Sequence, residues 1–222
     1  MMTRRQALLL LADPTVFDGI SFSGFRTPTR ETSPAVSWRI NNGTLETIAD
    51  ARRQCDLWTV AEYEQFDLRF EWKVAPGANT GIKYLIQEQA TDRLKDKQGE
   101  FLHETSLGFE LQLVDDASPA GSDQPAHVSG ALYNYLAPKE KAARPAGEWN
   151  TGRVVLRSDD VEHWINDRLV LAFSLHSPEL KASLAAARRN SARMLERLDK
   201  RKTPIAFQHH ESAVAFRAIR VR

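Results

Sequence analysis

Cysteine is almost absent from this sequence, and its scarcity excludes two kinds of architecture. Cys55 is the single cysteine among 222 residues, so no intramolecular disulfide can form. A zinc site built on several thiolates is excluded by the same count. The residues flanking Cys55 include no histidine, which gives a catalytic thiolate at this position little support.

An excess of one charge and a long hydrophobic run are also absent. The 30 basic side chains balance 29 acidic ones, so the net charge does not favour a nucleic acid or an anionic membrane as partner. No stretch approaches the roughly 20 apolar residues of a membrane-spanning helix. The common motifs GxxxxGKS/T, GxGxxG, HExxH and GxSxG are missing too. We therefore expect neither a nucleic-acid nor a membrane partner.

The first sixteen residues form a segment with two interpretations. Arg4-Arg5 followed by the apolar run 7–12 resembles a shortened twin-arginine export signal, which would make the protein periplasmic or secreted. Alternatively, the run docks on the domain as a short apolar segment, and the protein is cytoplasmic. We place a single folded domain over residues 17–222.

Alternation of apolar and polar residues predicts an all-β fold. From Phe66 to Val74, apolar residues hold every even position and charged ones every odd position, as in a half-buried strand. The turn residues 76–79 follow, and 81–87 resume as a strand. Further strands are predicted over 108–114, 153–157, 161–165, 168–173 and 213–222. Many short strands joined by turns indicate an antiparallel β-sandwich or jelly roll.

One long amphipathic helix is predicted over about 178–202, before the C-terminal strand. Ser177 is a good N-cap, Pro178 suits the first helical position, and apolar residues recur every three or four positions from Leu180 to Leu198. We interpret its basic face as solvated, on a helix that either covers the site or contacts a second copy in a homodimer. That face comprises Arg188, Arg189, Arg193, Arg197, Lys200, Arg201 and Lys202.

Polar members of the alternating strands would line a groove on one face of a sheet. They are Arg69, Glu71, Lys83, Glu110 and Gln112, and the cluster is densest where Asp115-Asp116 follows Gln112.

Aromatic and metal-binding side chains add further candidates. Trp149 and Trp164 lie beside Glu148 and His163 in the sequence, and proteins bind sugars with aromatic faces and fixed polar groups. The chemically suitable metal ligands have no diagnostic spacing, so the identity of any metal stays open. These ligands are His127, His163, His210, Glu110 and Asp115.

A series of short blocks resembles the 3-keto-disaccharide hydrolase-like family. The blocks follow the family's order across residues 17–222, and it is this ordered set that is specific. They are Phe17–Gly19, Leu57–Thr59, Phe66–Lys73, Gly77–Tyr84, Phe109–Asp116, Gly130–Tyr133, Pro145–Asn150, Val161–Asn166, Gln208–His210 and Phe216–Ile219.

The resemblance implies a concanavalin A-like sandwich with a concave carbohydrate site, acting on glycosides already oxidised at C3 of the sugar. The C3 ketone acidifies the C2 proton, so a general base can remove it and the C1 leaving group departs. Water can add back, which gives net hydrolysis. The enolate needs a cation or hydrogen-bond donors; a divalent metal ion would serve, although no cofactor is certain.

The resemblance also indicates which residues form this site. The predicted catalytic residues are Glu110, His210, Glu148 and Asp115. The predicted substrate-binding residues are Asn79, Lys83, Gln112, Trp149, His163 and Glu71. The sequence departs from the family where His209 and Glu211 replace the usual aspartate and glycine around His210.

Three other functions stay open at this point. The altered 208–211 segment suits a non-catalytic carbohydrate-binding module. A conventional glycosidase would need two carboxyl groups about 5–5.5 or 6.5–9.5 Å apart across the groove. The basic helix suits an interaction module whose binding depends steeply on salt.

Overall fold

The computed structural model describes residues 15–119, 124–187 and 190–222. The segment that resembles an export signal, Arg4–Ala12, lies outside this range, as do Arg188 and Arg189 of the predicted basic face. None of the helices in the described part of the chain is long and apolar enough to cross a membrane.

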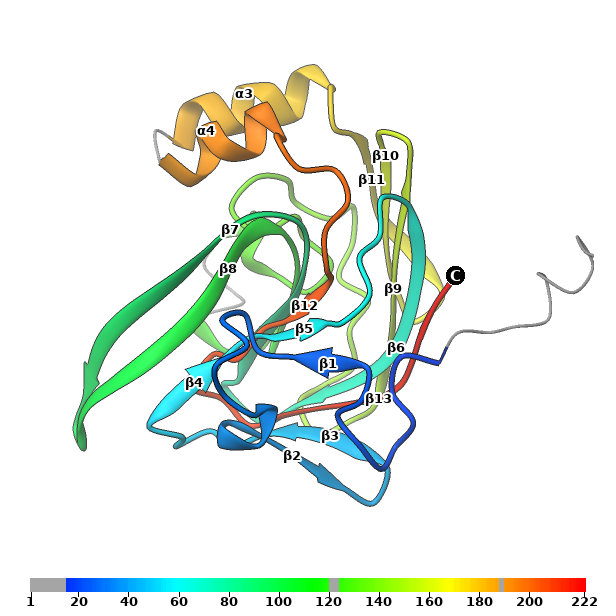
Figure 1. Ribbon diagram of the computed structural model, residues 1–222. Helices are drawn as coiled ribbons and strands as arrows, with labels where there is room; N and C mark the ends of the chain where they lie inside the picture. The colour runs from blue at the N-terminus through cyan, green and yellow to red at the C-terminus, as the bar shows by residue number, and fades with distance from the viewer. Residues whose placement is uncertain (1–14, 120–123, 188–189) are drawn as a thin grey trace, which may run out of the picture.

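The described strands form two sheets that pack face to face (Figure 1). The six-stranded sheet has the order β1 (Phe25–Arg26), β5 (Leu57–Thr59), β12 (Ala206–Phe207), β7 (Asn79–Asp96), β8 (Gly99–Val114) and β4 (Arg53–Cys55). The seven-stranded sheet has the order β11 (Arg168–Ser174), β10 (Asp160–Ile165), β9 (Asn150–Arg157), β6 (Phe66–Val74), β13 (Val214–Val221), β3 (Thr44–Thr47) and β2 (Trp38–Asn41). The predicted β-sandwich is confirmed, with one parallel pair, β4 and β8, among the antiparallel ones.

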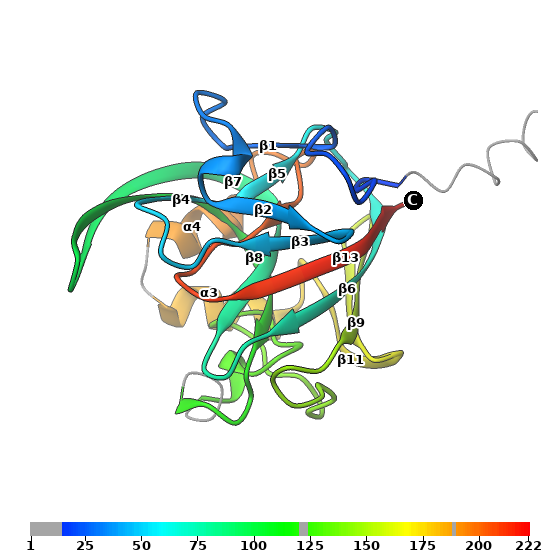
Figure 2. The same ribbon diagram turned by 90° about the horizontal axis from the view of Figure 1, so that it is seen from below.

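The core lies between the sheets and follows from the alternation. Leu68, Phe70 and Trp72 of β6 point inward, and Ile82 and Tyr84 of β7 face them from the other sheet. Aromatic rings fill the centre, where Phe207 and Phe216 meet edge to face with centroids 5.1 Å apart. Figure 2 shows β2, β3, β13, β6 and β9 side by side in the seven-stranded sheet.

The hairpin of β7 and β8 extends beyond the sandwich as a curved arm (Figure 1). Its register shifts between Tyr84 and Glu88, where Leu85 adopts a φ of 49°. Such a bulge bends a strand and increases its twist. Residues before the bend belong to the sandwich, and those after it form the arm.

The prediction of one helix over 178–202 is wrong. The structure has two helices, α3 (Pro178–Ala187) and α4 (Asn190–Arg197), which lie side by side. Ser177 Oγ accepts a hydrogen bond from the Leu180 amide at 3.3 Å, as expected for the N-cap, and Leu198 leaves the helical region at a φ of 49°. The two helices bring Leu180, Leu184, Ala192 and Leu195 to the same core. Two short 3₁₀ helices, η1 (Pro34–Val36) and η2 (Pro125–His127), complete the fold.

Candidate active site

The outward face of the six-stranded sheet carries a cluster of polar side chains. In β7 and β8, Ile82 and Leu111 point into the core, so their neighbours Lys83 and Glu110 point to the opposite face. In the register of the two strands, Lys83 lies opposite Glu110, and Gly81 lies opposite Gln112. The predicted residues Lys83, Glu110 and Gln112 therefore lie together.

Two other segments join this face from distant parts of the chain. In β12, Ala206 pairs with Lys83 on one side and with Trp58 of β5 on the other. The backbone amide of Gln208, just beyond β12, donates to the Gly81 carbonyl at 2.9 Å. Asp56, directly before β5, and Gln208 are thereby placed beside Lys83.

The Glu110 carboxylate lies directly over Gly81. A Cβ at position 81 would come within 2.2 Å of Glu110 Oε1, so only glycine leaves room for this side chain. Glu110 is 8% exposed. Burial raises the pKa of Glu110 to about 7; Lys83 opposes the shift and Asp56 adds to it. Glu110 can therefore exchange a proton near neutral pH.

Gln208 connects Glu110 to Lys83. With its amide oriented so that both neighbours are satisfied, Gln208 donates to Glu110 Oε1 at 3.2 Å and accepts from Lys83 Nζ at 3.3 Å. The acid and the ammonium group are thus joined through one neutral side chain.

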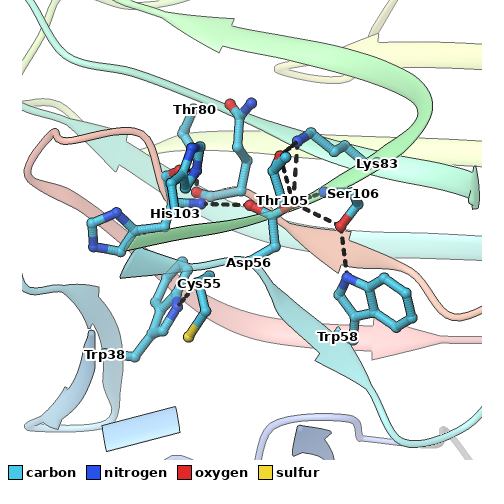
Figure 3. Close-up of polar contacts among 11 residues, drawn as sticks. Trp38, Cys55, Asp56, Trp58, Thr80, Lys83, His103, Thr105 and Ser106 are labelled. Carbon is cyan, nitrogen blue, oxygen red and sulfur yellow. Dashed lines mark hydrogen bonds and ion pairs between the residues drawn. The ribbon is translucent and has the colours of Figure 1, made fainter. Parts of the chain in front are cut away.

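Lys83 is held in place by a carboxylate and a hydroxyl group. Its Nζ donates to Asp56 Oδ2 at 3.1 Å and to Thr105 Oγ1 at 2.8 Å, and its side chain is almost fully buried. Figure 3 shows Asp56 at the centre of this cluster, with Lys83, Thr105 and Ser106 around it. A lysine with two fixed acceptors presents a localised positive charge to the site.

The remaining predicted residues of this face lie around the cluster. Gln112 Nε2 donates to Asn79 Oδ1 at 3.0 Å, which fixes two amides beside Gly81. His210 is exposed two residues beyond Gln208. Asp115, at the end of β8, accepts from the amides of Gly77 at 2.9 Å and Ala117 at 3.1 Å. Asp115 therefore braces the loops next to the site.

The structure does not bring His163 to this face. His163 lies between the sheets, fully buried, with Nε2 hydrogen-bonded to Tyr84 Oη at 2.9 Å and Nδ1 to the Gly130 carbonyl at 3.0 Å. Burial lowers the pKa of His163 to about 4. It is a neutral core residue, because its strand position points inward with Val161 and Ile165.

Glu71, Glu148 and Trp149 are also separated from the cluster. Glu71 projects from the outer face of the seven-stranded sheet and pairs with Arg217 at 2.6 Å. The Arg217 guanidinium also stacks over the Trp149 ring at 4.0 Å, and exposed Glu148 adjoins that ring in the sequence. Alternation had indicated that Glu71 faces outward, but the structure assigns it to the other sheet, where Trp149 also lies.

A groove of about 480 Å³ lies on that same outer face, away from Glu110. Its aromatic wall is Trp164, whose ring is already covered by the Arg153 guanidinium at 5.3 Å. Asp67, also in the wall, accepts two hydrogen bonds from Arg153, at 2.6 and 2.7 Å. Glu71, in the same wall, is paired with Arg217. Because the Trp164 ring and both of these carboxylates are engaged by arginines, this groove offers less chemistry than the Glu110 face.

The candidate site does not fit a divalent metal ion. Among residues 15–119, 124–187 and 190–222, no three His, Cys, Asp or Glu side chains converge as ligands. The cation beside Glu110 is the Lys83 ammonium, and Asp56 is already engaged by it. Cys55 lies buried against Ser37, and burial raises the pKa of its thiol to about 12, which leaves it no nucleophilic role.

Sequence reasoning missed four residues of the cluster as site residues: Asp56, Thr105, Ser106 and Gln208. One signal was available, since Asp56 is a charged residue between apolar Cys55 and Leu57. A fully buried carboxylate needs a partner. Nothing in the sequence indicates that this partner is Lys83.

Comparison with known proteins identifies the family of this chain. The family model described as the 3-keto-alpha-glucoside-1,2-lyase-like domain matches residues 14–222. A Bacteroides thetaiotaomicron protein named 3-keto-disaccharide hydrolase is 30% identical over 237 residues, which cover 94% of this chain and 77% of that protein.

Two solved structures from Parabacteroides distasonis, both provisionally assigned as glycosyl hydrolases, share the fold. The first has a TM-score of 0.76 at 23% identity and covers 100% of this chain and 97% of its own. The second has a TM-score of 0.68 at 20% identity, with coverages of 95% and 98%. The match of the family model over nearly the whole chain, together with the Bacteroides relative, shows that this chain belongs to the carbohydrate hydrolase-like family of 3-keto-alpha-glucoside-1,2-lyase-like domains.

Proposed function

We propose that this protein cleaves 3-keto-glycosides by elimination, with Glu110 as the general base. The observation that carries the proposal is a buried carboxyl with a pKa of about 7 whose neighbouring cation is a fixed lysine. A base with a pKa near the working pH is the most effective, and one such group contributes typically 10²–10⁴-fold.

Each step follows from the ketone at C3. Glu110 takes the C2 proton, and the electron pair moves towards the C3 carbonyl, giving an enolate. The enolate then forms the C1–C2 double bond as the C1–oxygen bond breaks, and the departing oxygen takes a proton from water. The product is a keto-glycal, and addition of water across the double bond gives the 3-keto-sugar. The names lyase and hydrolase among its relatives fit these two end points.

Lys83 supplies the charge that the enolate requires. Its ammonium is fixed by Asp56 and Thr105, so little reorganisation is needed when negative charge develops. The Asn79–Gln112 pair lies on the same face and would orient the sugar hydroxyls. The mechanism routes no step through a metal ion.

A two-carboxylate glycosidase is less compatible with this geometry. The second carboxylate near Glu110 is that of Asp56, and it is fully buried. Its oxygens accept from Lys83, from the amide and hydroxyl of Ser106, and from the His209 amide. A carboxylate enclosed in this way cannot attack a sugar or protonate a leaving group.

The test is product analysis of the purified protein with an aryl 3-keto-glucoside, with and without EDTA and added divalent metal. We expect release of the aryl alcohol together with a keto-glycal or 3-keto-glucose, and a slower reaction when C2 carries deuterium. Glu110→Gln should lower turnover about 10²–10⁴-fold. Glu46→Gln, on the other sheet, is the matched control.

Other outcomes would contradict the proposal. Cleavage of the unoxidised glucoside without a C2 isotope effect would indicate a conventional glycosidase. Binding of sugars with no turnover of any keto-glycoside would indicate a binding module. Loss of activity in EDTA, restored by a metal, would show that Lys83 is not the sole electrophile.

A further inference from the structure

Lys83 lies between two carboxylates and forms an ion pair with only one of them in the described part of the chain. Its Nζ is 3.1 Å from Asp56 Oδ2. No direct ion pair between Lys83 and Glu110 occurs among the described residues, and Gln208 links the two instead. A buried lysine beside a glutamate usually forms an ion pair with it, which lowers the pKa of the glutamate and makes it a weaker base. Something in this site prevents that pairing.

The hydrogen bonds around Asp56 show how its charge is fixed. Trp58 Nε1 can only donate, and it donates to Ser106 Oγ at 2.6 Å. The Ser106 hydroxyl proton is therefore free to donate to Asp56 Oδ2, at 2.7 Å. The Ser106 amide donates to the same oxygen at 2.9 Å, and the His209 amide donates to Oδ1 at 3.1 Å. Every one of these neighbours is a donor, so the group they surround is the ionised carboxylate.

These contacts join separate strands at one point. Asp56 precedes β5, Lys83 belongs to β7, Ser106 to β8, and His209 follows β12. The ammonium is thus anchored to Asp56 in the middle of the sheet (Figure 3).

We propose that Asp56 is a positioning residue for the reaction proposed above: it takes Lys83 as its own ion-pair partner and so keeps Glu110 from being neutralised by that lysine. Glu110 then remains a base, while the ammonium stays near enough to stabilise an enolate. The inference rests on the proposed function for its kinetic test, but its electrostatic part does not.

Three histidines also lie around this cluster, while beside Asp56 lie the buried thiol of Cys55 and Glu104, which pairs with Arg53. His103 Nε2 bonds to the His209 carbonyl at 3.0 Å, and His210 follows. Burial lowers the pKa of His209 to about 4, so it stays neutral in the range where Glu110 titrates. Although the His210 residue is exposed, desolvation by the groups packed around its ring lowers the pKa of His210 as well. Lys83 and Asp56 are therefore the charges that set the behaviour of Glu110.

The test is the pH dependence of kcat/KM in Asp56→Asn. Without its partner, Lys83 turns to Glu110, so we expect the acid limb to move from about 7 to lower pH by roughly one unit or more. We expect kcat to fall about 10–100-fold while KM changes little, and Asp56→Glu to restore the limb. Asp67→Asn, which breaks the ion pair with Arg153 on the other sheet, should leave the limb in place.

An acid limb that stays near 7 in folded Asp56→Asn would overturn the inference. If that variant does not fold, Thr105→Val tests the same point, because Asp56 still holds Lys83 and the acid limb should stay near 7. A downward shift in Thr105→Val would show that Asp56 is not the residue that holds Lys83 away from Glu110, and would overturn the inference. If the wild type turns over no keto-glycoside, the proposed function fails, and carbon-13 NMR of the Glu110 carboxyl tests the inference. There, too, an unchanged titration in Asp56→Asn would overturn it.

Discussion

At the scale of single residues, the position of the proposed base, Glu110, depends on the missing side chain of Gly81. Glu110 occupies the space above Gly81. There the backbone amide of Gln208 donates to the Gly81 carbonyl, and the side-chain amide of Gln208 donates to Glu110. Gly81 has no positive φ, so glycine is needed there for space and not for backbone freedom.

We predict that Gly81→Ala moves Glu110 and nearly abolishes turnover. The added Cβ would lie 2.2 Å from Oε1 and 2.6 Å from Cγ, so the whole side chain must shift. A base displaced by about 1 Å loses on the order of 10²-fold in rate. Steady-state kinetics with a keto-glucoside checks this. Gly77→Ala, which meets nothing within 4 Å, should lose stability from its φ of +75° but keep its activity.

Residues of the site were predicted unevenly because alternation identifies a face but not a sheet. Glu110 and Gln112 were placed correctly relative to Phe109 and Leu111. Glu71 and Trp149 also face outward, but from the other sheet. His163 has the same parity as Val161 and Ile165, and that parity alone would have placed it in the core.

At the scale of elements, the α3–α4 pair shows what an amphipathic pattern leaves open. The apolar positions were predicted, and Leu180, Leu184 and Leu195 are buried as expected. The pattern does not say where a helix ends when both halves can reach one core. Whether the pair covers the site or contacts a second copy stays a prediction.

We predict that Leu195→Ala destabilises the protein by about 2–4 kcal/mol, because it removes a buried side chain from the core that α4 shares with the sheets. Chemical denaturation measures this. Arg193→Ala, at an exposed position of the same helix, should change the free energy of unfolding by less than about 0.5 kcal/mol. Equal effects in the two variants would contradict the packing of α4.

At the scale of the whole molecule, buried titratable groups connect stability to pH. Burial lowers the pKa values of His163 and His209 to about 4, so between about pH 4 and 6.5 the unfolded chain binds their protons and the folded chain does not. The stability that these two neutral histidines allow the folded state is complete above about pH 6.5, and it is lost as the pH falls. Glu110 acts in the opposite direction, since its raised pKa favours the folded state at low pH.

We predict that stability rises by about 2–3 kcal/mol from pH 4.5 to 6.5, because two histidines outweigh one glutamate at about 1.4 kcal/mol per proton and pH unit. Denaturation at several pH values measures the slope. Glu110→Gln removes the opposing group and should make the rise steeper. A flat profile in the wild type would show that the histidines accept protons in the folded state.

The sequence by itself determined the local structure, namely the bounds of β6 and the inward face of its alternating residues, because these depend on residues two to four positions apart. It also identified Glu110 and Lys83 as residues of one polar face. Only the tertiary structure decided that Lys83 pairs with Asp56, 27 residues away, and that Ser106, 50 residues from Asp56, completes the contact. Strand order and register set such partners, and they follow from how the apolar faces of both sheets pack together.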